Sequence, residues 1–576
     1  MTNKIPALGE FQVNTYTKGN QSNPSVTSLT DGGFFVIWSS YDPGGSGSGV
    51  YGQRYDAAGA AAGDEFRIST NTEGSRGSPS LSDLADGGFV VTWQEYSLDG
   101  DQGVYGQRFD AAGTMVGDEF QILDGEGRYP VVAGLADGGF VVTWYFSNEN
   151  DTRYGVSGQR YDATGAAVGD EIQIAASSRI LENPSVSDLP DGGFIAIWAS
   201  RDNAWDTQDV DIYGRRYDAD GLATGAEFKV NNLTSDGSGF PSVTSLLDGG
   251  FVVTWVTDIY NVSDDDDIFG RRFDVNGVAM GDQFRINTYS TIPDTNFDQT
   301  EPSVTGLPDG GFAVTWTSDG QDGPGDGIYG QRYDADGNPS GDEFKVSVFN
   351  GRLGNSYVTA LPDGRLVVVW NSYRQDDDTH TTGVYGQRFD LVLSGSAEDD
   401  RLFGGPGNDS IETGDGEDYI RASAGADTID GGSDGDEGDR VSYWRTNEAV
   451  QIDLTAGTAS GGAAKGDVLI NIEDLSGGRS GDTLTGDEKA NSLLGHEGND
   501  TIKAMGGDDY VRGNLGADVL DGGDGARDRI SYWKSKAGVT VDFSDNANNA
   551  GGEAAGDMLT GFEDLSGSNS ADSLTT

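Results

Sequence analysis

Residues 395–430 read GSAEDDRLF-GGPGNDSIE-TGDGEDYIR-ASAGADTID, which are four units of nine residues in register. Position six of every unit is aspartate and position eight is leucine or isoleucine, as in Asp409 and Ile411. Glycines among the first six residues permit a tight turn, whereas the last three residues suit a short strand whose position-eight side chain points into a core. Because two units make one coil, the pattern predicts a parallel β-roll in which like turns stack.

The stacked turns carry the oxygen ligands that Ca²⁺ prefers, namely aspartate carboxylates and backbone carbonyls. Without metal the aligned carboxylates repel and little apolar area is buried, so we expect folding to require calcium. A second block begins at Gly477 and a third opens at Gly567. The candidate calcium-binding residues are turn residues of the first two blocks: Asp400, Gly404, Gly405, Gly407, Asp409, Gly414, Gly416, Asp418, Gly425, Asp427, Asp482, Gly495, Gly498, Asp500, Gly507, Asp509, Gly516 and Asp518.

These motifs resemble the RTX (hemolysin-type) calcium-binding repeats. Gly404-Gly405-x-Gly407-x-Asp409-x-Ile411 matches that pattern in full, whereas the units from Gly395 and Thr413 lack some of its glycines and Asn491 is a weaker ligand. The resemblance implies that type I secretion machinery exports the chain unfolded and that it folds outside in millimolar calcium. The protein is therefore expected to be secreted and to reside in the extracellular space or at the cell surface.

Two related inserts interrupt the repeats. The first runs from Ser442-Tyr-Trp444 to Leu475-Ser-Gly477, and the second repeats it from Ser531 onward. Both resemble inserts of RTX modules in the serralysin and alginate-epimerase families, and we expect them to cap or join rolls. The predicted boundaries are 393–440 for the first roll, 441–476 for its insert, 477–530 for the second roll, 531–566 for its insert, and 567–576 for the start of a third, truncated repeat block.

A different repeat fills residues 8–392. An Asp-Gly-Gly-Phe turn (Asp-Gly-Arg-Leu in the last repeat) and an apolar run ending in tryptophan recur seven times at a spacing of 51 to 61 residues, from Trp38 to Trp370. Each repeat continues with Val-Tyr-Gly-Gln-Arg and Gly-Asp-Glu-Phe-like segments, which gives four predicted strands joined by glycine turns. Seven repeats of four strands predict an all-β, seven-bladed β-propeller in front of the rolls.

The ends of the array favour a closed ring over an open solenoid. The seventh repeat stops after its third strand, and Phe11-Gln12-Val13-Asn14 closely matches the fourth-strand segment Phe228-Lys229-Val230-Asn231. We therefore expect the N-terminal strand to complete the last blade and remove the free edge.

The connections between strands 2 and 3 and between blades differ from repeat to repeat, and in a propeller they emerge on one face. That variable face is the expected binding face. It carries acidic runs at 264–267 and 376–378 and the loop residues Trp205, Tyr260, Tyr373, Phe297 and His380. Its strand 2–3 loops are 41–49, 96–103, 148–154, 201–211, 258–267, 318–327 and 371–383. The acidic loops are either solvated turns or contacts to calcium or another ligand, and His380 is expected to be a surface residue.

Composition excludes several classes of protein. The formal net charge of −59 argues against nucleic-acid binding, because phosphates would be repelled. Without cysteine there are neither disulfides nor thiolate metal sites, and two histidines argue against zinc sites and histidine-based triads. No apolar stretch is long enough for a membrane span, and the first residues do not read as a Sec signal peptide.

Three functions remain open for the propeller. The preferred hypothesis is an adhesion or surface module that binds glycan or another cell-surface ligand through the variable face. The second is a carbohydrate-active hydrolase or lyase, although no carboxylate pair stands out and the sialidase Ser-x-Asp-x-Gly-x-x-Trp box is absent. The third is a structural component of a surface layer or filament. No catalytic residue is predicted, and the oligomeric state is left open.

Overall fold

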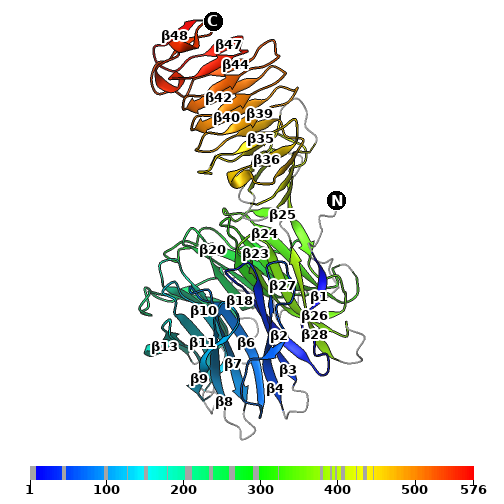
Figure 1. Ribbon diagram of the computed structural model, residues 1–576. Helices are drawn as coiled ribbons and strands as arrows, with labels where there is room; N and C mark the ends of the chain where they lie inside the picture. The colour runs from blue at the N-terminus through cyan, green and yellow to red at the C-terminus, as the bar shows by residue number, and fades with distance from the viewer. Residues whose placement is uncertain are drawn as a thin grey trace. The chain divides into compact units, whose positions relative to one another are not determined.

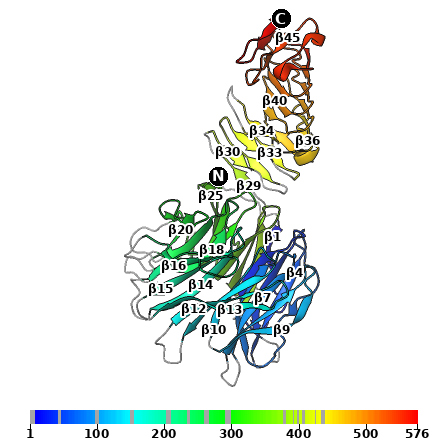
Figure 2. The same cartoon turned by 90° about the vertical axis from the view of Figure 1, so that its left-hand side faces the viewer.

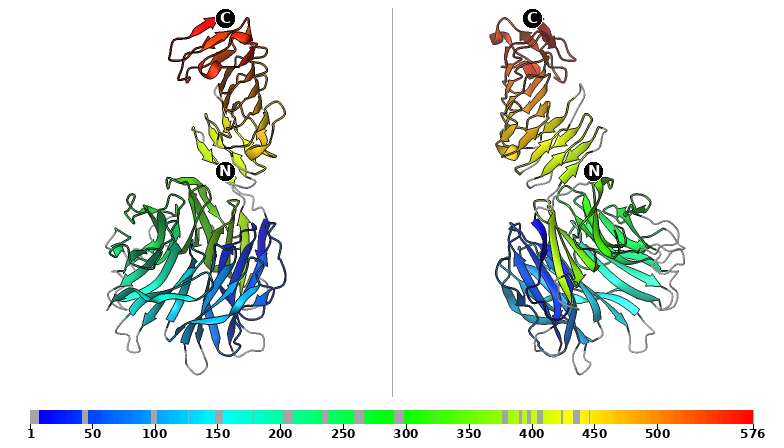
Figure 3. Two further views of the ribbon diagram at one scale, coloured as in Figure 1. Left: turned by 60° about the vertical axis from the view of Figure 1, so that its left-hand side comes forward. Right: turned by 90° about the vertical axis from the view of Figure 1, so that its right-hand side faces the viewer.

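The computed structural model describes residues 8–41, 47–96, 102–125, 127–147, 154–177, 179–201, 210–232, 238–257, 266–289, 298–321, 323–375, 381–389, 392–395, 399–403, 409–422, 425–432, 438–444 and 446–575. The chain divides into two compact units, one formed by Lys4–Phe389 and the other containing Asp390–Thr576. The first is a ring of twisted sheets and the second a stack of short strands (Figure 1, Figure 2 and Figure 3).

Strands of the first unit form seven four-stranded antiparallel sheets within the described ranges, so the predicted seven-bladed propeller is confirmed. The strands of blades 1 to 3 are β2 (Gln21–Ser28), β3 (Phe34–Tyr41), β4 (Ser48–Tyr55), β5 (Phe66–Arg67); β6 (Ser75–Asp83), β7 (Phe89–Tyr96), β8 (Gln102–Phe109), β9 (Met115–Asp124); β10 (Gly127–Gly134), β11 (Phe140–Ser147), β12 (Tyr154–Tyr161) and β13 (Ala167–Ser177). Those of blades 4 to 6 are β14 (Ile180–Asp188), β15 (Phe194–Arg201), β16 (Val210–Tyr217), β17 (Phe228–Lys229); β18 (Ser238–Ser245), β19 (Phe251–Thr257), β20 (Asp267–Phe273), β21 (Phe284–Arg285); β22 (Gln299–Gly306), β23 (Phe312–Asp319), β24 (Asp326–Tyr333) and β25 (Pro339–Lys345).

The seventh blade closes the ring. It contains β26 (Arg352–Ala360), β27 (Leu366–Tyr373) and β28 (Thr382–Phe389), and its fourth strand is the N-terminal β1 (Leu8–Gln12). Strand β1 runs antiparallel to β28, with Phe11 opposite Gly386, and the Val13 amide donates to the Val384 carbonyl at 2.8 Å. The predicted closure by the N-terminal strand is confirmed.

Both glycines have a steric role in the Asp-Gly-Gly turns of blades 1 to 6, whereas blade 7 has Arg365 in the second place. In the first blade Gly32 has φ of +82°, and a Cβ on Gly33 would lie 2.4 Å from the Tyr55 carbonyl oxygen. Asp31 accepts the Gly33 amide at 3.0 Å through Oδ1, which fixes the turn. The predicted hairpin with positive φ is therefore present.

The same aspartate also pairs with an arginine. In blades 1 to 6 this arginine comes from the third strand, and in blade 7 it is Arg365 of the turn itself. The pairs are Asp31–Arg54, Asp86–Arg108, Asp137–Arg160, Asp191–Arg216, Asp248–Arg272, Asp309–Arg332 and Asp363–Arg365. Such partly exposed pairs contribute little to stability individually, but they neutralise one carboxylate in every blade.

The repeated tryptophans form the core between blades. All seven are almost completely buried, at 0 to 2 % exposure. Trp93 of blade 2, for example, shares its cluster with Phe35 and Ile37 of blade 1. The repeated positions are thus packing residues, as the sequence predicted.

Every first strand contains a β-bulge at one residue with positive φ. These seven residues are Asn23, Ser78, Tyr129, Asn183, Phe240, Glu301 and Asn355, all with φ near +50°. Side chains other than glycine rarely adopt this conformation, and a bulge redirects the side chain at that point. Of these seven side chains, that of Glu301 carries a carboxylate.

The second unit is built from two long sheets. The ten-stranded sheet has the order β29 (Val392–Ser394), β31 (Ser410–Glu412), β33 (Thr428–Asp430), β37 (Val468–Ile470), β36 (Thr458–Ser460), β35 (Gln451–Asp453), β39 (Thr483–Thr485), β41 (Thr501–Lys503), β43 (Val519–Asp521) and β46 (Met558–Thr560). The eight-stranded sheet has the order β30 (Arg401–Phe403), β32 (Tyr419–Arg421), β34 (Arg440–Ser442), β38 (Asp474–Ser476), β40 (Ser492–Glu497), β42 (Tyr510–Leu515), β44 (Arg529–Ser531) and β47 (Asp564–Ser566). Two further strands, β45 (Thr540–Asp542) and β48 (Ser573–Thr575), pair with each other, and three short 3₁₀ helices are η1 (Gly462–Ala464), η2 (Asn546–Asn548) and η3 (Gly552–Ala554).

The register of these sheets gives one coil for two nine-residue units. Strand β31 lies parallel to β33, with Ile411 opposite Ile429, and the position-eight side chains of the paired strands are fully buried. Their cluster runs through the whole unit. The predicted parallel β-roll with an inward position-eight residue is confirmed.

The first insert continues the stack. Its strands β35, β36 and β37 lie between β33 and β39 in the ten-stranded sheet, while β34, β38 and β40 are direct neighbours in the other sheet. The two repeat blocks therefore share both sheets, and the insert joins them.

Candidate functional site

The position-six aspartates of the roll form a hydrogen-bonded ladder beside the ten-stranded sheet. The Asp482 amide donates to Oδ1 of Asp500 at 2.8 Å, and the Asp500 amide donates in the same way to Asp518 at 2.9 Å. Asp409 and Asp427 repeat this contact at 2.9 Å in the first block. Each carboxylate thus uses one oxygen to hold the turn 18 residues before it.

A second ladder follows the eight-stranded sheet. The amide of Asp400 donates to Asp418 at 2.6 Å, and in the second block Asn491 donates to Asp509 at 2.8 Å. Asn491 keeps its place because its side-chain amide donates to the Glu473 carbonyl at 2.8 Å. The Asn491 side chain thus contacts the turn 18 residues before it by donating a hydrogen bond instead of accepting one, and it supplies no charge.

In five of these aspartates the other carboxylate oxygen is buried and has no hydrogen-bond partner among the described residues. This holds for Oδ2 of Asp418, Asp427, Asp500, Asp509 and Asp518. Burial raises the pKa of Asp427 to about 7, that of Asp500 to about 8 and that of Asp509 to about 7. A buried, orphaned oxygen on a carboxylate that resists ionisation fits a site for a hard cation, which would supply the missing positive charge.

The turn glycines make room for these carboxylates. Gly414, Gly416, Gly498 and Gly507 have positive φ, from +104° to +134°. A Cβ on Gly495 would lie 2.2 Å from Oδ2 of Asp500, and the turn containing Gly425 belongs to the same stack.

Gly516, in the next turn of the stack, is needed because the backbones of neighbouring turns approach closely there. A Cβ on Gly516 would lie 1.8 Å from the Gly498 carbonyl oxygen. In the described ranges no three His, Asp or Glu side chains converge as a metal site, so a calcium ion here would also need carbonyl oxygens of the turns. The predicted ligands Gly404, Gly405 and Gly407 lie outside the described residues.

The ladders end at residues that sequence reasoning did not select. The Asp427 amide donates to Asp467 at 2.9 Å and the Asp518 amide to Asp557 at 3.0 Å. At these two aspartates a tyrosine hydroxyl donates to Oδ2, from Tyr443 at 2.7 Å. Tyr532 repeats that contact with Asp557 at 2.8 Å. In the insert, a tyrosine hydroxyl therefore donates to the carboxylate oxygen that has no partner in repeat aspartates such as Asp427 and Asp518.

Two further ladder aspartates, Asp439 and Asp528, were also missed. Asp439 Oδ1 accepts the Asp418 amide at 2.8 Å, and Asp528 Oδ1 accepts the Asp509 amide at 3.0 Å. Their turns are longer than six residues, since Gly431 precedes Asp439 by eight positions. The signal that identifies them is an aspartate two residues before a buried valine or isoleucine.

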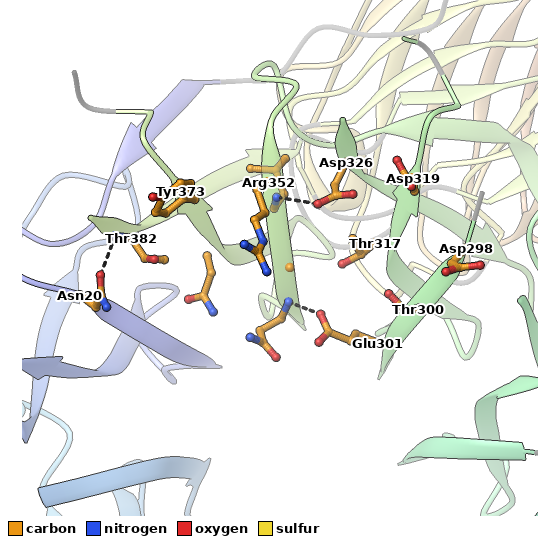
Figure 4. A pocket seen from close by; sticks show the side chains of 14 residues that line it. Asn20, Asp298, Thr300, Glu301, Thr317, Asp319, Asp326, Arg352, Tyr373 and Thr382 are labelled. Carbon is orange, nitrogen blue, oxygen red and sulfur yellow. Dashed lines mark hydrogen bonds between the residues drawn. The ribbon is translucent and has the colours of Figure 1, made fainter. Parts of the chain in front are cut away.

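The propeller has a polar pocket on the variable face. The pocket has a volume of about 590 Å³ and lies between blades 6 and 7, with one residue from the start of blade 1. Figure 4 shows Arg352 among several carboxylates. Its lining is Asn20, Asp298, Thr300, Glu301, Thr317, Asp319, Asp326, Arg352, Leu353, Gly354, Asn355, Asn371, Tyr373 and Thr382.

Backbone amides of blade 7 hold two carboxylates of blade 6 in this pocket. Asp326 accepts the Leu353 amide at 3.2 Å, and Glu301 accepts the Asn355 amide (Figure 4). Asp319 lies directly opposite Asp326 across β23 and β24. Burial raises the pKa of Glu301, and burial followed by the charge of Asp319 raises that of Asp326.

Other parts of the predicted binding face cannot be placed. Trp205, Tyr260, Phe297 and His380 lie outside the described residues, as do most of the acidic runs near 264–267 and 376–378.

Comparison with known families identifies the roll. Residues 392–420, 403–437, 476–504 and 494–527 match the RTX calcium-binding nonapeptide repeat in four copies. The chain therefore carries RTX calcium-binding repeats, as the motifs predicted, next to a seven-bladed propeller.

Several solved structures match part of the chain at low sequence identity. One is a protein of unknown function from Dyadobacter fermentans (13% identity, 66% of this chain, 97% of that chain, TM-score 0.40). Others are an α-L-arabinanase of Penicillium chrysogenum in complex with arabinobiose (16%, 54%, 92%, TM-score 0.37) and the polysaccharide lyase Uly1 (10%, 65%, 91%, TM-score 0.41). No curated protein matches the chain. In the described part of the chain, no helix is long and apolar enough to cross a membrane.

Proposed function

We propose that this is a secreted protein whose RTX roll binds calcium and folds on doing so outside the cell, while the propeller serves as an adhesion or glycan-binding module. The observation that supports the calcium part is the row of buried aspartate oxygens without partners, exemplified by Asp427, Asp500 and Asp518. Calcium supplies the charge that these carboxylates lack, and the chain's own ladder hydrogen bonds position them.

The same row accounts for export before folding. At the low calcium concentration of a cytosol the ladder carboxylates would be ionised on unfolding and uncompensated on folding, so the unfolded chain is favoured. Type I machinery would then pass an unfolded chain, and millimolar calcium outside would drive folding.

The test is a calcium titration of the full chain, followed by far-UV circular dichroism and by limited proteolysis of the roll. We expect a cooperative gain of β structure with calcium and much less with magnesium, because magnesium demands a stricter geometry and gives up water reluctantly. A roll that is equally folded and protease-resistant in chelator would contradict the proposal.

A second candidate, a glycan-cleaving enzyme, is favoured by one observation. Asp319 of β23 and Asp326 of the neighbouring strand β24 lie directly opposite each other, which places their Cβ atoms about 5 Å apart. Two neighbouring carboxylates can act as acid and base in glycoside hydrolysis. Incubation of the calcium-loaded protein with a panel of polysaccharides, followed by a reducing-end assay, decides it: release that persists in D326N would not come from this pair.

A further inference from the structure

The pocket between blades 6 and 7 contains a buried acceptor that the protein leaves unsatisfied. Asn371 is 8 % exposed and lines the cavity, and its Oδ1 has no hydrogen-bond partner among the described residues. A buried polar atom without a partner costs about 1–3 kcal/mol, so such atoms usually mark a place for a ligand or water. This acceptor therefore indicates that the cavity receives a hydrogen-bond donor.

The other residues that line the pocket indicate which chemical class of ligand could supply this donor. Asp298, Glu301, Asp319 and Asp326 contribute carboxylates, whereas Arg352 contributes the cationic side chain of the lining. Four carboxylates thus face one guanidinium, and the local charge is negative. An anionic ligand such as a uronate or a sulfated sugar would be repelled, while hydroxyl groups could donate to several oxygens at once.

The carboxylates are fixed before any ligand arrives. Glu301 and Asn355 both lie at bulges with positive φ, of +55° and +51°, and the Asn355 amide donates to Glu301. Asp326 is held by the Leu353 amide at 3.2 Å. Strand β26 of blade 7 therefore clamps acidic side chains of blade 6, and a preorganised polar site binds with less loss of entropy.

A metal ion is a poorer occupant than a sugar. Among the described residues no three acidic or histidine side chains come together as a metal site, and a cavity of about 590 Å³ is far larger than an ion needs. Tyr373 adds an aromatic side chain to the lining, which a sugar ring can contact through its C–H groups.

We propose that this pocket is a saccharide-binding site selective for uncharged, polyhydroxylated sugars, with Asn371, Glu301 and Asp326 accepting the sugar hydroxyls. The inference rests on the proposed glycan-binding role of the propeller and assigns that role to one place and one chemical class.

The experiment compares binding of the calcium-loaded full chain to neutral and uronate oligosaccharides by glycan array, followed by calorimetry with the best neutral ligand. Variants N371A and E301Q each remove one acceptor, and we expect each to weaken binding about tenfold. The matched control is S39A, because Ser39 follows Trp38 just as Asn371 follows Trp370 but lies outside the pocket. Its affinity should equal that of the wild type.

Variant D326N tests the selectivity. An asparagine still accepts the Leu353 amide but removes one charge, so the preference for neutral over uronate sugars should shrink. Melting temperatures of all variants confirm folding.

The outcomes separate the two claims. If a neutral glycan binds and N371A, E301Q and D326N bind it like the wild type, the pocket assignment is overturned while the glycan-binding role stands. If uronates bind better than neutral sugars, the chemical class is overturned. If no glycan binds, both the role and the assignment fail.

Discussion

Replacing Asp500 by asparagine should stabilise the roll when calcium is absent and destabilise it when calcium is bound. Without a cation, Oδ2 of Asp500 is a buried acceptor with no partner among the described residues, and burial raises the pKa of this carboxyl to about 8. Asparagine keeps an oxygen that can accept the Asp482 amide but carries no charge. D500N should therefore stabilise the calcium-free roll at neutral pH by about 2 kcal/mol, because folding no longer has to bury a carboxylate charge or take up a proton.

In calcium the same change removes a ligand, so D500N should be less stable than the wild type. For a unit of this size, about 2 kcal/mol corresponds to a shift of about 6 °C in melting temperature. Thermal unfolding of the full chain, followed by far-UV circular dichroism from chelator to millimolar calcium, measures both ends.

The control is D545N, which removes an exposed charge in the second insert while an asparagine can still cap η2. It should leave both melting temperatures unchanged. If D500N and the wild type gain the same number of degrees from calcium, Asp500 does not bind the ion and the reasoning from the orphaned oxygen is wrong.

Three further changes test other parts of the structure. Tyr532→Phe removes the hydroxyl that donates to Asp557 at 2.8 Å, and should lower the melting temperature of the calcium-loaded roll by about 6 °C; an unchanged value would mean that a cation satisfies Asp557 instead. Burial, and then the charge of Asp83, raises the pKa of Asp188 above its unfolded value, so its stabilising contribution is complete below about pH 4 and is lost as pH rises through the folded pKa. D188N should therefore melt higher than the wild type at neutral pH, with the difference vanishing in acid, and an equal difference at both pH values would refute this. Deletion of the segment through β1 (Leu8–Gln12) should leave β28 as an open edge and cause self-association in size-exclusion chromatography, whereas a monomer would show that the ring does not depend on closure.

The propeller could be predicted almost completely because each repeat carries the same short sequence motifs at its strands and turns. A tryptophan in each second strand and two glycines in six of the seven turns repeat at nearly fixed spacing, and the glycines have a steric reason visible in the structure, as at Gly33. The closing strand was predictable because Phe11 repeats the place of Phe228, and both lie on fourth strands.

The pocket could not be predicted because its residues meet only through the ring. Glu301, Asp326 and Asn371 lie on three different strands of two blades, and nothing distinguishes them among the 95 acidic residues or the many polar loop positions. What singles out Glu301 is a backbone conformation, positive φ at a bulge, that its own side chain does not favour. Tertiary packing imposes that conformation.

The functional residues of the roll could be predicted in part. Regular units were found by position, so Asp409 and Asp500 were predicted, whereas Asp439 was missed because its turn is longer. Sequence reasoning assigned the inserts a capping or joining role but could not show how Tyr443 takes part, because a tyrosine hydroxyl meeting a carboxylate 24 residues away leaves no periodic signal.

The two units compensate the negative charge of their aspartates in different ways. In the propeller each turn aspartate meets an arginine, as in Asp137 with Arg160 at 2.7 Å, so folding brings its own countercharge. In the roll the carboxylates stack on one another, and in Asp427, Asp500 and Asp518 a backbone amide satisfies only one of the two oxygens. Folding the propeller thus compensates these charges within the chain, whereas folding the roll creates a demand for external cations. It follows that the two units should unfold in separate transitions, and that chelation should shift the transition of the roll far more than that of the propeller.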